Sequence, residues 1–345
     1  MRVAMIDLTG QAGRWSEEAL QLWRSALAQE TAVATAVAAP APMLGDPALR
    51  AAIGKMLAIP TEEVVVTAGA RAAALALARI RPSFYVEAPT FKAIPMLIQK
   101  SGTRVLLGPW SSIREVVTCG RGADREVALW VTSPARNPDG RSLSKDMVRV
   151  LEDFAAEGGI VVQNETYRWY QPGADRVRGA TIVGSLSKLA GAGARLGWIA
   201  RPSSGPGWDT ISFGAGPPGM WQRTWARFIE QDGISYLMRS YVEPAAAACR
   251  AFWAVIVDCF DASVPSPDGP SVLLPFDSSE IELKVFRELQ LAGVIVTRGA
   301  AFQSPIPSLR FCFSGVSVAE AVQAAEIVVN SVKVSGVTKI AVLAE

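Results

Sequence analysis

The chain has 345 residues, half of them apolar and 19% charged, with 34 lysines and arginines against 32 aspartates and glutamates. This composition supplies a large buried core, and the near-neutral charge argues against a nucleic-acid-binding surface. Because the chain contains no histidine, serine–histidine catalysis, cysteine–histidine catalysis and histidine-ligated metal sites are all excluded. Proton transfer must fall to lysine, tyrosine, a carboxylate or a cofactor.

The apolar stretches, the N-terminus and the cysteines of the sequence together favour a cytoplasmic protein. The longest apolar stretch, Ala32–Leu44, is too short to span a bilayer and contains two prolines, and the N-terminus shows no signal-peptide pattern. The four cysteines are too scattered for a zinc ribbon or a redox pair, and we expect reduced thiols. They are Cys119, Cys249, Cys259 and Cys312.

The first predicted element is a helical stretch, Ser16–Gln29, within an N-terminal segment of residues 1–45. Two domains are predicted to follow: a large domain over residues 46–240 and a small one over residues 241–345. We expect the N-terminal segment to pack against the small domain.

In the large domain, short runs of apolar and β-branched residues alternate with stretches of helical periodicity. Continuously apolar strands separated by helices predict a mostly parallel sheet sandwiched by helices, an α/β fold. The strand-like runs are Val64–Val66, Phe84–Val86, Val127–Thr132, Gly159–Val162 and Thr181–Val183; the helical stretches are Ala70–Ile80, Phe91–Lys100 and Leu143–Ala156.

Beyond residue 235 the pattern changes. A long helical stretch, Ser235–Phe260, ends at a loop rich in proline, serine and glycine, Pro265–Pro270. Strand-like and helical stretches then mix, which predicts a smaller α+β domain. These stretches are Val272–Phe276, Glu280–Leu291, Val294–Val296, Leu309–Phe313 and Ser317–Val332.

In open α/β sheets, ligands bind beyond the carboxyl ends of the strands, so the residues there are the candidate site. The most informative segment is Ser185–Trp198, in which Lys188 directly follows a buried strand and lies between hydroxyl and small residues. Arg195 comes seven positions later. A surface lysine in a flexible loop is the simple alternative, and this segment alone does not decide between the two.

Four other strand ends shift the balance toward a site. Gly69 begins a helix, where free backbone N–H groups can hold a phosphate. Phe91 follows the next strand and can lie against a planar ring, Asn137 sits among turn residues, and Asn164 and Tyr167 end a further strand. Each has an ordinary structural explanation, but their combined order is difficult to attribute to packing.

This order resembles that of fold-type-I pyridoxal-phosphate enzymes, the aspartate-aminotransferase superfamily. The resemblance extends from Gly45 to Phe311, and its most specific part is the S-L-S-K segment followed by R-L-G-W. With the N-P-D-G-R, V-T-R-G and L-R-F-C-F-S-G motifs, the chain looks most like histidinol-phosphate aminotransferases. It looks equally like the threonine-phosphate decarboxylases of cobalamin biosynthesis.

The resemblance implies a role for each matching residue. Lys188 would form the internal aldimine with the cofactor and then move the Cα proton. The Gly69 and Ala70 amides, Ser185, Ser187 and Arg195 would hold the cofactor phosphate. Phe91 would stack on the pyridine ring, while Asn137 and Tyr167 would hydrogen-bond its 3-oxygen. Arg310 would bind the substrate carboxylate. Arg298 would meet a second substrate anion, or else be a solvated surface residue.

Two positions depart from the family pattern. Asn164 stands where the family has an aspartate that keeps the pyridine nitrogen protonated, and a neutral amide leaves a weaker electron sink. Glu165 points to the opposite face of its strand and cannot compensate. Residues Ala39–Pro42 stand where relatives carry a tyrosine that reaches the neighbouring subunit's cofactor phosphate, so we expect a homodimer with reduced cofactor affinity.

Three functions follow from this reading. The leading one is a pyridoxal-phosphate-dependent aminotransferase acting on an amino acid. A decarboxylase of a phosphorylated amino acid is the alternative, because Arg298 and Arg310 together suit a substrate with two anionic groups. The third is a catalytically attenuated scaffold, which Asn164 favours and the retention of Lys188 and Arg195 opposes.

Overall fold

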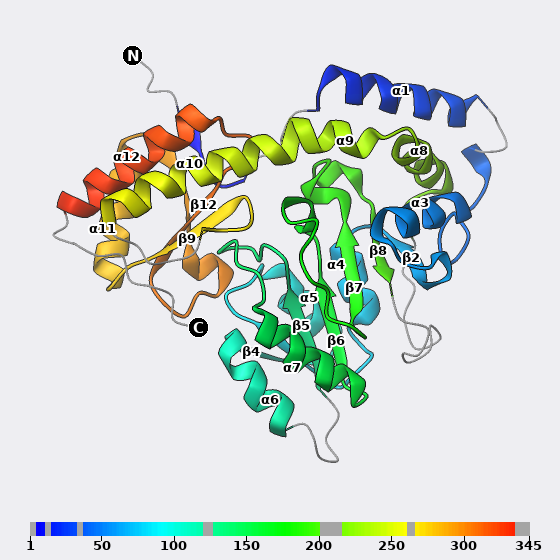
Figure 1. Cartoon of the computed structure of the whole chain (residues 1–345), viewed down its shortest axis with the longest axis horizontal. Helices are drawn as coiled ribbons and strands as arrows, with labels where there is room; N and C mark the ends of the chain where they lie inside the picture. The colour runs from blue at the N-terminus through cyan, green and yellow to red at the C-terminus, as the bar shows by residue number, and fades with distance from the viewer. Residues whose placement is uncertain are drawn as a thin grey trace.

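The computed structural model describes residues 5–10, 15–32, 37–119, 127–200, 216–260 and 266–334, and these form a larger and a smaller α/β part (Figure 1). Within the described chain, the larger sheet has seven strands in the order β2-β8-β7-β6-β5-β3-β4. The strands are β2 (Val64–Thr67), β3 (Ser83–Glu87), β4 (Arg104–Gly108), β5 (Val127–Thr132), β6 (Ile160–Asn164), β7 (Thr181–Ser185) and β8 (Gly197–Ala200).

The predicted mostly parallel sheet is confirmed. Neighbouring strands from β4 across to β7 run parallel, while β8 is antiparallel to both β7 and β2. Strands β4 and β8 were not predicted. All five residues of β4 are only partly buried or exposed, and β8 begins with glycine and has just three apolar residues after it, none of them β-branched except Ile199, so neither shows the β-branched apolar run that marked the other strands.

Helices cover both faces of the sheet because successive strand residues point to opposite sides. In β5, Ala128 and Trp130 pack with helices α4 (Ala70–Leu77) and α5 (Ala93–Lys100). Leu129 and Val131 pack on the other face, with α6 (Ile113–Cys119) and α7 (Lys145–Ala156). All four β5 side chains are fully buried, as a doubly covered sheet requires.

The smaller part has its own core. Strands β9 (Ser271–Pro275), β11 (Thr297–Arg298) and β12 (Ser308–Cys312) form an antiparallel sheet, and β1 (Ile6–Asp7) pairs parallel with β10 (Val294–Ile295). The helices around this core are α10 (Glu243–Phe260), α11 (Ser279–Leu291) and α12 (Val318–Val334).

The predicted helical stretch Ser235–Phe260 connects the two parts, as the long yellow-green helix of Figure 1 shows. It consists of α9 (Gly233–Leu237), a π-helical turn at Met238–Val242, and α10. Side chains up to Val242 belong to the large core, and those from Ala248 onward belong to the small one. In the part of the chain that the model describes, no helix combines the length and apolarity needed to cross a bilayer.

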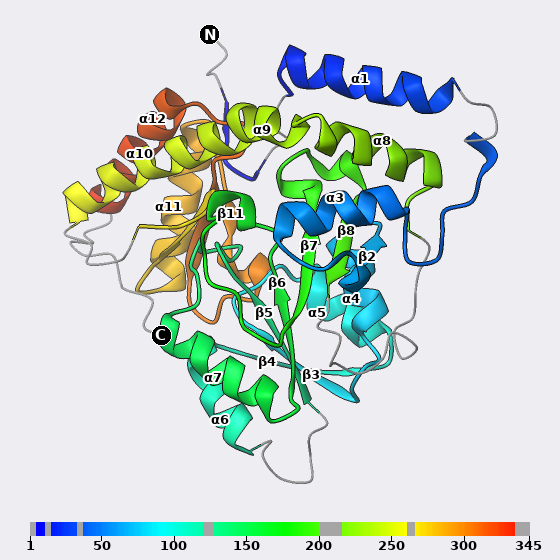
Figure 2. The ribbon, with the colours of Figure 1, turned by 45° about the vertical axis from the view of Figure 1, so that its right-hand side comes forward.

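The N-terminal segment does not pack as one unit. Strand β1 joins the small part, but helix α1 (Glu17–Thr31) packs along α8 (Gly219–Glu230) and α9, as Figure 2 shows. For this helix the expected packing against the small domain is wrong. Aromatic residues of both helices explain the contact, since the Trp23 ring lies 4.4 Å from that of Trp225. The buried Glu30 carboxylate also pairs with Arg223 and Arg227 of α8.

Candidate functional site

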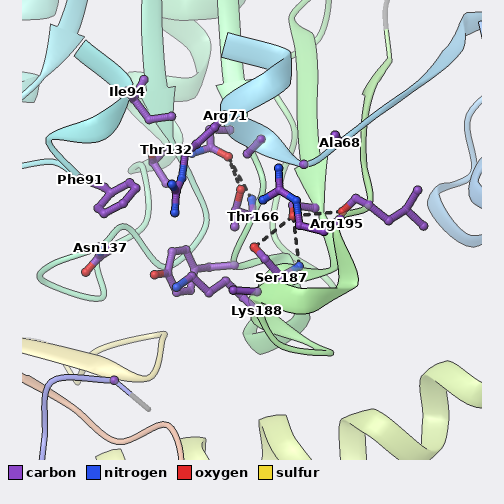
Figure 3. A pocket seen from close by; sticks show the side chains of 18 of the residues that line it. Ala68, Arg71, Phe91, Ile94, Thr132, Asn137, Thr166, Ser187, Lys188 and Arg195 are labelled. Atoms are coloured by element: carbon purple, nitrogen blue, oxygen red, sulfur yellow. Dashed lines mark hydrogen bonds between the residues drawn. The ribbon is translucent and has the colours of Figure 1, made fainter. Parts of the chain in front are cut away.

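A cavity of about 200 Å³ lies beyond the carboxyl ends of the parallel strands (Figure 3). This volume is enough for a small molecule. Most sequence-predicted site residues meet there: Gly69, Ala70, Phe91, Asn137, Asn164, Tyr167, Ser185, Ser187, Lys188 and Arg195 all line the cavity.

One end of the cavity is built to hold an anion. Helix α4 begins at Gly69, whose φ of 100° places it in the region that favours glycine, and no side chain caps the first amides of the helix. The Ser185 hydroxyl accepts a hydrogen bond from the Ser187 N–H at 3.0 Å, which holds both hydroxyls at this end. Arg195 lines the same end in a left-handed conformation, uncommon for a residue other than glycine.

The close approach of β8 to this loop explains a glycine in the R-L-G-W motif. A Cβ atom on Gly197 would lie 2.7 Å from the Gly69 Cα and 2.6 Å from the Gly184 carbonyl oxygen. Only a residue without a side chain lets strand β8 and the anion-binding loop pack this closely.

Lys188 ends a short 3₁₀ helix, Leu186–Lys188, directly after β7. Its Nζ lies 5.5 Å from the centre of the Tyr167 ring. The pKa of Lys188 is raised, chiefly by the Tyr167 phenol, with burial and Arg310 opposing the rise. The amino group is therefore protonated at neutral pH and must lose that proton before it can act as a nucleophile.

Asn164 ends β6 and is held by two threonines. Its Oδ1 accepts hydrogen bonds from the Thr166 N–H at 3.2 Å and the Thr166 hydroxyl at 2.5 Å. Its Nδ2 donates to Thr132 Oγ1 at 3.3 Å. Because a backbone N–H can only donate, Oδ1 must face Thr166, and the amide turns its N–H groups toward Thr132 and the cavity.

Glu165 lies on the other side of the strand, as expected. It is buried and forms ion pairs with Arg168 and Arg176. The carboxylate next to Asn164 in sequence is thus committed to a structural network and does not enter the cavity.

The remaining residues at the cavity's edge form an aromatic and amide wall. Phe91 is 39% exposed and lines the cavity. Asn137 is 8% exposed, yet its Oδ1 is buried without a hydrogen-bond partner in the described structure. A buried polar atom of this kind is satisfied when a ligand supplies the missing partner.

The two candidate substrate arginines differ. Arg310 is buried, donates to the Thr9 carbonyl at 2.9 Å, and lies just behind Gly10, which lines the cavity. Its Nε has no hydrogen-bond partner among the described residues. Arg298, by contrast, is not among the lining residues and makes two hydrogen bonds to the Glu282 carboxylate, at 2.9 and 3.0 Å. The structure therefore favours the surface interpretation of Arg298.

Sequence reasoning missed several lining residues. Thr132 ends β5 and is the register partner of Asn164, so the rule of strand ends would have identified it. Arg71 directly follows Gly69 and Ala70 and received no role. Tyr241 reaches the cavity from the connecting helix, about 50 residues beyond Lys188 in the chain, and no local sequence signal marks it.

A buried carboxyl group, that of Glu87, hydrogen-bonds the backbone of Thr132. Glu87, at the end of β3, accepts hydrogen bonds from the Thr132 N–H at 2.7 Å and the Trp110 indole at 2.7 Å. Burial raises the pKa of Glu87 to about 7, against the opposing effect of Arg136.

This raised pKa makes stability depend on pH. Between about pH 4.5 and 7 the unfolded chain has released the Glu87 proton while the folded chain retains it, so stability falls as pH rises. We expect a loss on the order of 3 kcal/mol across this window, and Glu87→Gln should remove that slope. Urea melts from pH 4.5 to 8 measure it, with the exposed Glu115→Gln as control. An unchanged slope in Glu87→Gln would contradict the assignment.

Comparison with known proteins places this geometry in a wider context. The family model of aminotransferases of class I and II matches residues 11–328. Aspartate aminotransferase from Thermus thermophilus, solved with maleate, is 21% identical with a TM-score of 0.75, covering 95% of this chain and 92% of that one. An archaeal alanine:glyoxylate aminotransferase is 18% identical, with a TM-score of 0.78 and coverage of 96% and 91%.

A third similar structure is the kynurenine aminotransferase of Pyrococcus horikoshii, 17% identical with a TM-score of 0.76, covering 96% of this chain and 91% of that one. At such identities the likeness shows the shared fold. Comparison with curated protein sequences gave no match.

Proposed function

Because the chain belongs to the class I and II aminotransferases, a family of pyridoxal-phosphate-dependent enzymes, we propose that it acts on an amino acid through Lys188. The observation that carries the proposal is the position of Lys188 within one cavity whose other end can bind a phosphate. Arg195, the hydroxyls of Ser185 and Ser187, and the free amides at the start of α4 are the groups that would hold the phosphate.

The other lining residues fit the rest of the cofactor. Phe91 offers a ring for stacking, and Asn137 has an unpaired buried oxygen in an amide that can rotate to donate to a ring oxygen. When bound, the cofactor would supply the electron sink that stabilises negative charge at the substrate Cα. Lys188 would carry the cofactor on its Nζ and, once freed from it, accept and return the Cα proton.

Asn164 is the residue that would face the ring nitrogen of the bound cofactor. Since Thr166 occupies its Oδ1, the amide can offer only N–H donors toward the cavity. A donor pairs with an unprotonated ring nitrogen, which is a weaker electron sink than a protonated one. We infer an enzyme with an attenuated sink, and a scaffold without chemistry would not require Lys188, Arg195 and Arg310 in this arrangement.

Transamination is the reaction we favour, with decarboxylation of a phosphorylated amino acid as the second candidate. Both need a cation for the substrate carboxylate, and Arg310, with its unpaired Nε behind Gly10, is suited to bind it. They differ in product, because transamination yields a keto acid and decarboxylation yields an amine with carbon dioxide. By family resemblance we also infer a homodimer, which sedimentation analysis tests.

The function is tested by mixing the purified protein with pyridoxal phosphate and recording absorption before and after borohydride. We expect a yellow band that borohydride removes, with the cofactor then found on Lys188 by peptide mapping. Product analysis with amino acids and phosphorylated amino acids follows. No band at any cofactor excess would overturn the enzyme proposal, and amine with carbon dioxide as products would select the decarboxylase.

A further inference from the structure

Arg71 is a cationic side chain in the cavity to which the proposed chemistry gives no role. It is the second residue of α4, it is exposed, and it lines the cavity with its guanidinium 5.8 Å from the centre of the Phe91 ring. Figure 3 shows Arg71 extending on the Phe91 side of the cavity, while Arg195 and Ser187 lie on the other side.

The charges around the cavity leave Arg71 available. Among the lining residues that the model describes, Arg71, Lys188 and Arg195 are cationic and no residue is a carboxylate. In the proposed function, Arg195 would hold the cofactor phosphate, Lys188 would carry the cofactor, and Arg310 behind Gly10 would bind the α-carboxylate. No described aspartate or glutamate forms an ion pair with Arg71. The contact that its guanidinium makes among the described residues is a cation–π contact with the Phe91 ring.

The position of Arg71 is electrostatically unfavourable without an anion. The first turn of a helix carries the positive end of its dipole, which favours acidic residues and disfavours cations. The Phe91 ring gives the guanidinium a cation–π contact but no opposite charge. The cofactor phosphate would lie at the amides that begin α4, on the side of Arg195 and Ser187, whereas the Arg71 guanidinium extends to the Phe91 side, where a second anion could pair with it.

We propose that Arg71 binds a second anionic group of the substrate, a distal carboxylate or phosphate ester, which is one of the two roles that the sequence left open for Arg298. Arg298 is 42% exposed on the surface and committed to Glu282, so it does not supply this charge. Identifying the anion as part of the substrate rests on the proposed function. The anion site itself is inferred from the position of Arg71 alone.

The test is calorimetric binding of butyrate, succinate and 3-phosphonopropionate to the protein mixed with pyridoxal phosphate, with the cofactor band recorded in parallel. The ligands are similar in length and differ in the second anion. We expect the better of the two dianions to bind roughly tenfold or more tightly than butyrate, because a charge-assisted arginine contact adds about that factor. The ratio of the affinities for succinate and 3-phosphonopropionate shows whether the site prefers a carboxylate or a phosphate-like group.

Arg71→Gln should abolish the preference for dianions while the cofactor band and butyrate affinity stay within about twofold. Arg298→Gln should keep the preference. The proposal is overturned if the unaltered protein does not distinguish dianions from butyrate, if Arg298→Gln removes the preference, or if Arg71→Gln instead loses the cofactor. A missing cofactor band in the unaltered protein contradicts the proposed function alone, since comparing the unaltered protein with Arg71→Gln by the same calorimetry still decides whether Arg71 binds the second anion.

Discussion

Replacing Lys188 with alanine is expected to abolish the borohydride-sensitive absorption band and lower turnover roughly 10³-fold or more. In the proposed function Lys188 would provide both the covalent attachment of the cofactor and the group that moves the Cα proton, and a positioned acid–base group alone contributes about 10² to 10⁴ in rate. Lys188 is the only lysine among the described lining residues, so no neighbour can replace it.

The measurement combines an absorption titration with pyridoxal phosphate and single-turnover kinetics. Noncovalent cofactor binding should largely survive, because Arg195, Ser185, Ser187 and the start of α4 are unchanged. The exposed Lys100→Ala serves as matched control and should behave as the unaltered protein. A band of normal intensity in Lys188→Ala would remove the assignment of this lysine.

Replacing Asn164 with aspartate is the second large effect, an expected gain in turnover of roughly tenfold or more. A carboxylate beside the ring nitrogen favours its protonation by about one to three pKa units and so strengthens the electron sink. The surroundings can accept the change, because Thr166 already donates to Oδ1 and the Thr132 hydroxyl can rotate to donate to the second oxygen.

Steady-state kinetics over a range of pH measure this effect, together with the spectrum of the bound cofactor. Thr132→Val is the companion variant, because it removes the acceptor of the Asn164 amide without adding charge, and it should leave turnover within a few-fold. Abolished activity in Asn164→Asp would show that the native reaction uses an unprotonated ring.

Much of the site could be predicted from local sequence because the rule that locates it is local. A continuously apolar strand must be buried on both faces, so the end of the apolar run marks where the chain leaves the sheet. Because the strands are parallel, the polar residues just beyond these ends lie at the same edge of the sheet. That reasoning located Gly69, Asn137, Asn164 and Lys188, which the fold brings to a single cavity. It also extends to Thr132, which was overlooked.

The features that the sequence left open or misjudged depend on partners distant in sequence. Arg298 lies in a motif typical of a phosphate-binding arginine, but Glu282, 16 residues earlier, holds its guanidinium at the surface. Helix α1 was expected to pack against the small domain, whereas its Trp23 meets the tryptophans of α8, about 200 residues later. Only the folded chain specifies such pairs.

The sequence by itself therefore determined the α/β class, the family, and the residues at the strand ends, because buried strands and the turns after them have compositions that can be read over a few residues. The tertiary structure alone decided which charges remain available in the cavity. It pairs Arg298 with Glu282 and leaves Arg71 without a described carboxylate partner. It also orients the Asn164 amide so that its N–H groups, and not its oxygen, face the cavity. Contacts between residues distant in sequence determine which charged side chains have partners, and such contacts exist only in the folded chain.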